Sequence, residues 1–307
     1  MAQQQMPNGR FAIKVLGVLF LALLWSHSVL AQTSFSLGIV SEMRQKEIEA
    51  HYRDFVRYVA RKLSAAPEME GKVVIAPNPA ELAKLLEQGR VDFYIESAYA
   101  TYIINDVEGA ARLLLRRWQR GKPEYQSFIF TNRNSGINRL DDLRGKIIVF
   151  EDRESTSGYF LPKFFLLRNG FKLSEKSRLE AGVPPEEIGY IFASSQGKLV
   201  SLVLTNEVAG GAFSDDDYDK LDENTRAQVG VLAQTERLPR HLVSIRKDMP
   251  QAMANRLKET LLAMSDDDEG RKILQKTGET DKFDILPEGE EGMRRRLLQT
   301  FYSPGKQ

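Results

Sequence analysis

The sequence predicts an α/β protein with two lobes, and three observations carry this prediction. Short apolar runs alternate along the chain with amphipathic segments of helical period, which is typical of sheets covered by helices on both faces. The 307 residues exceed the usual size of a single hydrophobic core. Two polar segments, 116–123 and 233–240, are expected to carry the chain between the lobes and back. We therefore expect one discontinuous lobe from residues 32–120 and 238–307, and a second lobe from residues 121–237.

The apolar runs and helical periods predict the order of the elements. Strands are expected at residues 34–40, 73–76, 91–95, 126–131, 146–150, 190–192 and 209–213, in largely parallel sheets. One face of the first helix is apolar through Ile48, Tyr52, Phe55, Val56, Val59 and Leu63. The second helix begins at the cap Asn78, has Pro79 in its first turn and ends at Gly89. Further helices are expected at 158–168, at 197–205 and over most of the chain from Asp248, which we expect to pack on the first lobe.

The first thirty-one residues have the pattern of a secretory signal peptide. Arg10 and Lys14 precede an apolar run over residues 15–25, and small or apolar residues end the segment at Ala31. Eleven apolar residues at about 1.5 Å each are too short to cross a hydrocarbon layer of roughly 30 Å. We therefore expect cleavage after Ala31 and a mature protein in the bacterial periplasm.

The composition excludes several classes of function. The chain has 43 Lys and Arg residues against 42 Asp and Glu residues, so it lacks the basic excess typical of nucleic-acid binding. It has no cysteine, which excludes disulfides, thiolate zinc sites and cysteine nucleophiles. Its three histidines leave little for metal or triad chemistry, and no hydrolase, zinc-protease or nucleotide-binding motif is present. We expect a protein that is not an enzyme and has neither cofactor nor metal. The less favoured alternative is an exported enzyme on the same scaffold, for which Glu96 with Ser97 or Tyr125 are the only candidates and lack a histidine partner.

The most informative segment is a hydroxyl-rich turn between a strand and a helix. Ser155, Thr156 and Ser157 follow the strand 146–150 and would occupy the cap and first turn of the next helix. Free N–H groups and hydroxyls there point the same way, and the helix dipole favours negative charge, so such a turn can hold an oxyanion without Lys or Arg. The alternative is that one serine only caps the helix.

Other candidates lie at strand ends or beside the first crossover. Tyr125 and Ser127 begin the second lobe and are expected to face the gap between lobes, although Tyr125 has the alternative role of packing at the hinge. At the end of the strand 91–95, Glu96, Ser97 and Tyr99 contribute a carboxylate and two hydroxyls, with capping, packing or solvation as alternatives.

Two further turns repeat the order of strand, polar turn and helix. Ser195 and Gln196 either begin a helix only or donate to the same ligand. Asp215 follows the strand 209–213 and either accepts a ligand amine or lies in a solvated acidic turn, which is the favoured reading.

Several of these segments occur in an order that resembles a known family. They are 92–99 (DFYIESAY), 125–127 (YQS), 141–146 (DDLRGK), 155–159 (STSGY) and 211–213 (GAF). Over residues 34–300 the chain resembles the phosphate-, phosphite- and phosphonate-type substrate-binding proteins of ABC transporters, a branch of the type II periplasmic binding proteins.

The resemblance implies two α/β lobes joined by two crossovers, with a small oxyanion or zwitterion held between them. It implies that Ser155, Thr156 and Ser157 hold the oxygens and that Tyr125, with Tyr99 or Ser97, closes over them. Two features depart from the family pattern. Ser195-Gln196 stands where a Ser-His pair is common, and Glu96 adds a carboxylate that opposes a bound anion unless it is protonated or a ligand cation intervenes. The expected partner is a transporter permease or, alternatively, a membrane sensor kinase, and the chain is expected to be a monomer.

Overall fold

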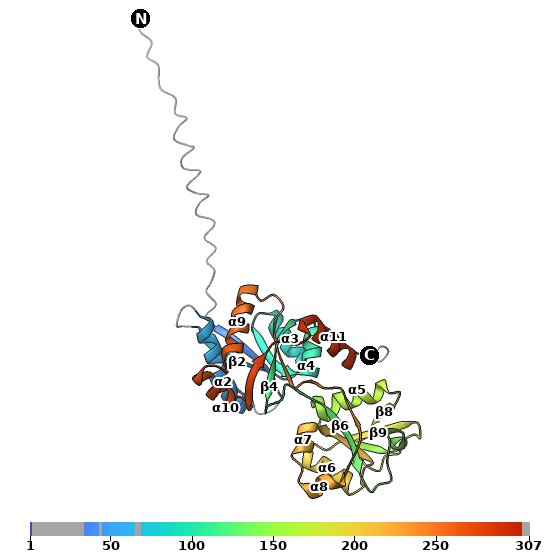
Figure 1. The fold of residues 1–307 in the computed structure, drawn as a ribbon. Coiled ribbons are helices and arrows are strands. Elements are labelled where there is room, and N and C mark those ends of the chain that lie inside the picture. The colour runs from blue at the N-terminus through green and yellow to red at the C-terminus, as the bar shows by residue number, and fades with distance from the viewer. Residues whose placement is uncertain (2–33, 43–44, 65–68, 303–307) are drawn as a thin grey trace. The chain divides into compact units, whose positions relative to one another are not determined.

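The computed structural model describes residue 1 and residues 34–42, 45–64 and 69–302. The predicted signal peptide lies almost entirely outside these residues. Within them, two six-stranded sheets form, each with helices on both faces (Figure 1). None of the described helices is long and apolar enough to cross a membrane.

The first sheet has the strand order β14-β4-β13-β3-β1-β2. Its strands are β1 (Ser34–Val40), β2 (Glu70–Ala76), β3 (Phe93–Ser97), β4 (Ala111–Gln119), β13 (His241–Arg246) and β14 (Thr280–Asp284). Helices α2 (Gln45–Leu63), α9 (Gln251–Ala263) and α10 (Asp268–Lys276) cover one face, where Phe55 and Leu257 join Phe93 in one core. The other face carries α3 (Pro79–Glu87), α4 (Ala98–Tyr102), the π-helical turn η1 (Ile103–Val107) and α11 (Gly289–Phe301). The C-terminal part therefore packs on the first sheet, as predicted.

The second sheet has the strand order β11-β6-β10-β7-β9-β8. Its strands are β6 (Ser127–Asn132), β7 (Ile147–Phe150), β8 (Lys172–Glu175), β9 (Glu187–Phe192), β10 (Gly210–Ser214) and β11 (Val229–Gln234). Its helical segments are η2 (Leu140–Leu143), η3 (Thr156–Phe160), α5 (Leu161–Arg168), α6 (Gln196–Leu204), α7 (Asp215–Asp219) and α8 (Glu223–Gln228). Helix α6 covers one face through Leu199, and α5 covers the other through Leu166.

Each sheet is parallel on one side and antiparallel on the other. Strands β1, β2 and β3 run parallel, whereas β13 and β14 pair antiparallel to their neighbours. In the second sheet β7, β8, β9 and β10 are parallel, and β6 pairs antiparallel to both β10 and β11. The prediction of largely parallel sheets is therefore only half right, because the antiparallel strands that border the crossovers were not anticipated from the sequence.

Two short strands join the sheets. Strand β5 (Glu124–Tyr125) pairs antiparallel with β12 (Leu238–Pro239), which brings the two crossings of the chain side by side. The first predicted crossover, 116–123, began too early, since β4 continues to Gln119. Arg116 remains in the strand because its guanidinium donates to Asp284 at 2.8 and 2.9 Å. The buried Arg117 donates to the Gly278 carbonyl at 3.0 Å. The residue boundaries of the two lobes stay a prediction.

Candidate functional site

The hydroxyl-rich turn lies at the carboxyl end of β7, where open α/β sheets bind ligands. Ser155 is the N-cap of η3. Its Oγ accepts from the Gly158 N–H at 2.9 Å and donates to Glu151 Oε2 at 3.1 Å. Gly158 must lack a side chain, because a Cβ there would lie 2.7 Å from the Glu151 Cβ. Ser155 therefore shapes the turn, which is the capping role raised as the alternative.

Thr156 and Ser157 form the first turn of η3, and their side-chain hydroxyls lie beside the Tyr125 hydroxyl. Thr156 is only 4% exposed, yet its Oγ1 has no hydrogen-bond partner among the residues that the structure describes. Among the same residues, the N–H groups of Thr156 and Ser157 make no backbone hydrogen bond outside the helix itself. An unpaired buried hydroxyl costs about 1–3 kcal/mol. The turn therefore presents donors that an anion would satisfy.

Tyr125 lies against this turn from β5. It is 3% exposed, and the Arg240 guanidinium carbon is 4.4 Å from its ring centroid. Burial raises the pKa of Tyr125 to about 12, although the Arg240 charge and the neighbouring hydroxyls of Thr156 and Ser157 oppose that shift. The phenol therefore keeps its proton at neutral pH and is a further donor beside the turn.

Ser127, the first residue of β6, is hydrogen-bonded to the turn. Its Oγ is fully buried and donates to the Ser157 carbonyl at 2.5 Å, with the Phe213 carbonyl at 3.4 Å. Its N–H donates to Thr235 Oγ1 at 2.9 Å. Ser127 thus connects the strand β6 to the turn, and its one hydroxyl proton is already used within the protein.

The first sheet contributes a carboxylate at the end of β3. Glu96 Oε1 accepts from the Val40 N–H at 2.7 Å. Burial raises the pKa of Glu96 to about 7, despite the opposing effects of the Val40 and Ser97 N–H groups and of Arg117. Ser97 begins α4 without a side-chain capping bond. The side chain of Glu96, near the carboxyl end of β3, therefore titrates near neutrality.

Tyr99 joins the two sheets. Its ring stacks on Phe160 of η3, with 3.4 Å between centroids and 16° between planes, and it also contacts Phe164 and Phe301. Burial raises the pKa of Tyr99. The structure places this ring in an aromatic cluster between α4, α5 and α11.

Glu96, Ser97 and Tyr99 line a cavity of about 240 Å³ together with Arg153, Glu154 and Phe160 from the second sheet. Both Glu96 and Glu154 have raised pKa values, each caused first by burial. The remaining wall is formed by Val40, Asn78, Pro79 and Ala100. This cavity therefore has walls from both sheets and carries two carboxylates.

Ser195 and Gln196 lie at the start of α6. Ser195 is exposed and caps the helix, since its Oγ accepts from the Lys198 N–H at 3.4 Å. Gln196 is the half-buried first residue of α6. No hydrogen bond between described residues joins either side chain to Tyr125 or to the turn 155–157.

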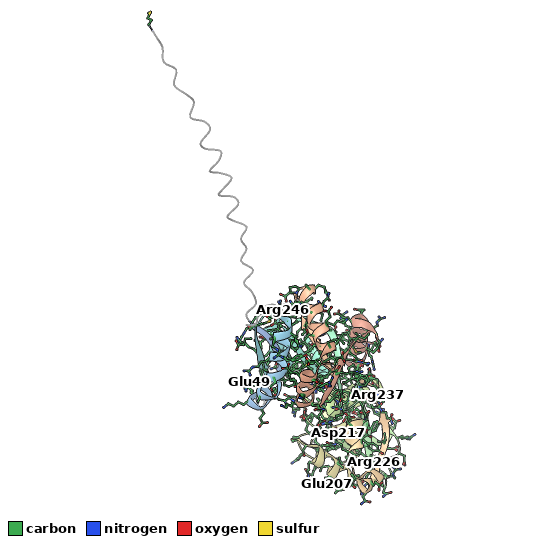
Figure 2. All side chains as sticks on the ribbon, turned by 60° about the vertical axis from the view of Figure 1, so that its left-hand side comes forward. Glu49, Glu207, Asp217, Arg226, Arg237 and Arg246 are labelled. Carbon is green, nitrogen blue, oxygen red and sulfur yellow. The ribbon has the colours of Figure 1, made fainter. Side chains whose placement is uncertain are left out.

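The expectation of a solvated acidic turn at Asp215 is wrong. Asp215 and Asp216 are 6% and 8% exposed, and cations of the crossovers neutralise them. Arg237, labelled in Figure 2, donates to Asp215 at 3.0 Å. Asp216 pairs with Arg240 and, at 3.0 Å, with Lys122. The sequence shows these charged residues, but it does not show that they pair, because the pairs form only when the two crossovers lie side by side.

Sequence reasoning gave no role to two cationic residues near the site, Arg117 and Arg240, and favoured a structural role for His241 at the return crossover. Arg117 is 2% exposed, and its Nε is without an acceptor among the described residues. His241 pairs with Ser97 across the sheet, and burial, followed by Arg117 and Arg240, lowers its pKa well below the usual value. The available signal was the polar character of the crossover segments, whose side-chain partners the sequence does not show.

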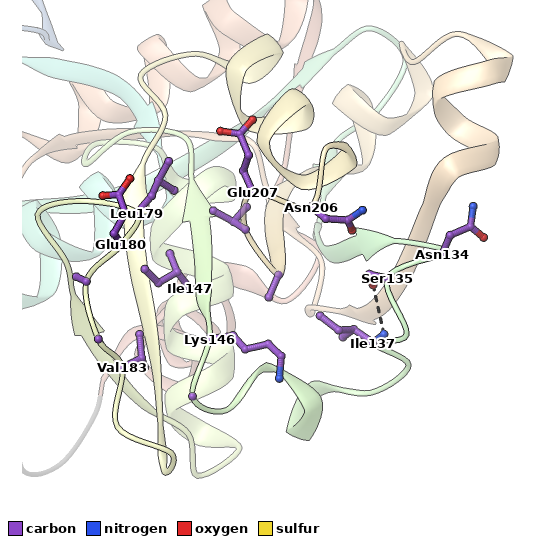
Figure 3. Close-up of a pocket in the computed structure, with 15 residues that line it drawn as sticks. Asn134, Ser135, Ile137, Lys146, Ile147, Leu179, Glu180, Val183, Asn206 and Glu207 are labelled. Atoms are coloured by element: carbon purple, nitrogen blue, oxygen red, sulfur yellow. Dashed lines mark hydrogen bonds between the residues drawn. The ribbon is translucent and has the colours of Figure 1, made fainter.

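Another cavity, of about 610 Å³, lies elsewhere in the second sheet (Figure 3). It is at the opposite end of the second sheet, because Lys146 precedes β7 whereas Ser155 follows it. Lys146, Glu180 and Glu207 line it from different segments. Among the described residues there is no group of three His, Cys, Asp or Glu side chains that could hold a metal ion.

Comparisons with known proteins agree on one family. The family model described as "ABC transporter, phosphonate, periplasmic substrate-binding protein" matches residues 37–286. The phosphate-import protein PhnD of Mycolicibacterium smegmatis is 24% identical over 192 residues, which are 61% of this chain. The chain spans only 57% of the length of that relative.

Two solved structures are similar to this chain over most of its length. XAC2383 from Xanthomonas citri bound to ATP has 26% identity and a TM-score of 0.74, covering 87% of this chain and 95% of that one. PhnD1 from Prochlorococcus marinus in complex with methylphosphonate has 14% identity and a TM-score of 0.58, covering 87% and 98%. These likenesses confirm the predicted fold of the type II periplasmic binding proteins.

Proposed function

Because the chain belongs to the family of periplasmic substrate-binding proteins of phosphonate ABC transporters, we propose that it binds one small phosphorus oxyanion between its two sheets. The bound anion is then delivered to the permease of an ABC transporter. We also propose that residues 1–31 are a signal peptide, removed after Ala31, and that the protein makes and breaks no bond in its ligand.

The observation that carries this proposal is the set of donors at the start of η3. The N–H groups of Thr156 and Ser157, the buried Thr156 Oγ1 and the neighbouring Tyr125 hydroxyl come from two segments that are far apart in the chain. Charge-assisted hydrogen bonds to an anion are short and about twice as strong as neutral ones. Several of them together account for a micromolar dissociation constant, which corresponds to about −8 kcal/mol.

Residues on both sheets support a binding step that is coupled to closure. Thr156 and Ser157 belong to the second sheet, whereas Ser97 and Glu96 belong to the first. An anion held by the turn gains contacts to the first sheet only when the two approach, so ligand binding favours the closed arrangement. The paired strands β5 and β12 are the segments about which such a motion would occur.

The relatives narrow the ligand class without fixing one compound. Phosphate and methylphosphonate appear in the names of two relatives, and ATP appears in the name of the more similar structure. All three present tetrahedral phosphorus with terminal oxygens, which is the group that the η3 turn is proposed to hold.

Isothermal titration calorimetry on ligand-free protein tests the proposal. Phosphate, phosphite, methylphosphonate, 2-aminoethylphosphonate and ATP are titrated separately into wild type and Thr156→Val. Heat from at least one of them in wild type, much reduced in the variant, is the expected result. If none of the five compounds gives heat, in protein shown to be folded by circular dichroism, the proposal that the protein binds a phosphorus oxyanion is rejected.

A further inference from the structure

We propose that Arg240 supplies a formal positive charge to the oxyanion site and makes that site prefer a doubly charged oxyanion over a singly charged one of the same shape. This inference rests on the proposed function and specifies its ligand class. It also corrects the expectation that the turn works without Lys or Arg.

The position of Arg240 is set by the second crossing of the chain. It lies between β12 and β13, directly after Pro239, whose strand pairs with that of Tyr125. Its guanidinium carbon lies 4.4 Å from the centroid of the Tyr125 ring. This contact is a cation–π interaction, and it holds the charge over a buried ring.

The Tyr125 ring connects Arg240 to the hydroxyl turn. Arg240 lowers the pKa of the Tyr125 hydroxyl, as do the neighbouring hydroxyls of Thr156 and Ser157. The charge of Arg240 is therefore felt at the same oxygen that Thr156 and Ser157 approach. An anion bound to those donors lies within reach of that charge, in a partly buried setting where solvent screens it weakly.

Arg240 is able to turn toward a ligand without leaving its present partner unpaired. It now pairs with Asp216, whose side chain is 9% exposed. Asp216 is also held by Lys122 at 3.0 Å, so it keeps a counter-charge when Arg240 shares its donors with an anion. A guanidinium has five N–H donors, and only its Nη2 is bonded to Asp216 in this arrangement.

The second arginine of the same crossing, Arg237, is a matched control. It donates to the neighbouring aspartate Asp215 at 3.0 Å and to the Glu124 carbonyl at 3.1 Å. Its side chain is 44% exposed, against 21% for Arg240. Each arginine lies in the second crossover and forms an ion pair with an aspartate that follows β10. Among the described contacts, only Arg240 lies over the Tyr125 ring.

The test compares methylphosphonate with its monomethyl ester in alkaline buffer. The first ligand then carries two negative charges, whereas the ester carries one at any pH above its first ionisation. Calorimetric dissociation constants are measured for both ligands with wild type, Arg240→Gln, Arg240→Lys and Arg237→Gln.

Arg240→Gln is expected to weaken methylphosphonate binding by about 10- to 100-fold and ester binding by much less, because a charge-assisted hydrogen bond is lost. Arg240→Lys should restore part of the preference for two charges, and Arg237→Gln should leave the ratio of the two dissociation constants unchanged. A purely structural role at the hinge would weaken both ligands equally, and that result overturns the inference. Wild type that binds neither ligand nor the five compounds above instead overturns the proposed function.

Discussion

The two sides of the candidate site differ in the charge that their polar groups can carry. On the second sheet, the η3 turn presents neutral donors whose geometry is fixed, since Ser155 caps the turn and Ser127 holds its Ser157 carbonyl. On the first sheet, Glu96 is an acid whose pKa of about 7 lets its charge vary with pH. Under the proposed function, the η3 side would recognise the anion, and the charge of Glu96 would set how strongly the first sheet opposes it.

The strongest test of the donor side is Thr156→Val, which removes the unpaired hydroxyl and keeps the shape. Ligand affinity should fall by about 10- to 100-fold, since a donor to a charged group is lost. The free energy of unfolding of the ligand-free protein should change little, because the buried Oγ1 meets the geometry of a hydrogen bond with no described residue, although it lies beside the Tyr125 hydroxyl. Calorimetry and urea denaturation measure the two quantities.

Ser155→Ala is the control for that variant. Its hydroxyl caps η3, so the variant should lose about 1 kcal/mol of unfolding free energy even without ligand. A similar loss of stability in Thr156→Val would mean that both residues only shape the helix.

The acid side is tested by Glu96→Gln. The pKa of Glu96 is about 7 in the folded protein against a usual value of 4.5, so between these pH values the folded state binds a proton that the unfolded state lacks. The free energy of unfolding therefore falls as the pH rises through this window, by roughly 1–3 kcal/mol from this group. Urea denaturation at about pH 5 and about pH 8 should show this difference in wild type and a smaller one in the variant.

The same variant sharpens the comparison with ligand present. An ionised Glu96 repels an anion, so wild-type affinity should weaken above neutrality more than that of Glu96→Gln. Two other groups act on Glu96 and need to be followed: Glu154, which raises its pKa, and Arg117, which lowers it. Parallel pH profiles for wild type and variant would contradict a regulating role for this carboxylate.

Ser127→Ala tests whether the turn is positioned by the strand beneath it. The variant leaves the Ser157 carbonyl without its donor, and we expect a loss of about 1 kcal/mol of unfolding free energy. Differential scanning calorimetry without ligand measures it. If the ligand-free variant keeps its full stability while its affinity for the ligand drops, Ser127 contacts the ligand rather than positioning the turn.

The smallest effect is expected for Tyr99→Phe. The ring stack on Phe160 survives this change, so unfolding free energy and affinity should each change by less than about 0.5 kcal/mol. A tenfold loss of affinity would give the Tyr99 hydroxyl the ligand role that the family resemblance implies. Tyr99→Ala, which removes the stack, is the comparison that should lower stability.

The sequence predicted the elements whose signals are local and missed those that depend on distant partners. The alternation of apolar runs predicted the strands near 34–40 and 146–150 and the cap at Asn78, because periodicity and capping act over a few residues. Strand β4 was missed because Arg116 and Arg117 placed its end in the polar segment that was predicted as a crossover. Their partners, Asp284 and the Gly278 carbonyl, lie more than 150 residues away in the sequence.

The site shows the same limit. The turn 155–157 was recognised because its hydroxyls are consecutive, and the structure divides their roles only through contacts that no spacing contains. The ion pair between Arg240 and Asp216 was not predicted, because the two residues come together only when strands β5 and β12 of the two crossovers pair.

The helix that begins at the turn has a second attachment at its other end. Segments η3 and α5 contribute five and eight consecutive residues, so at about 1.5 Å per residue this rod is roughly 20 Å long. Its last residue, Arg168, donates to the carbonyls of Gln299 and Thr300 at the end of α11. Any displacement of the turn along this axis would therefore strain or shift the contact with the end of α11.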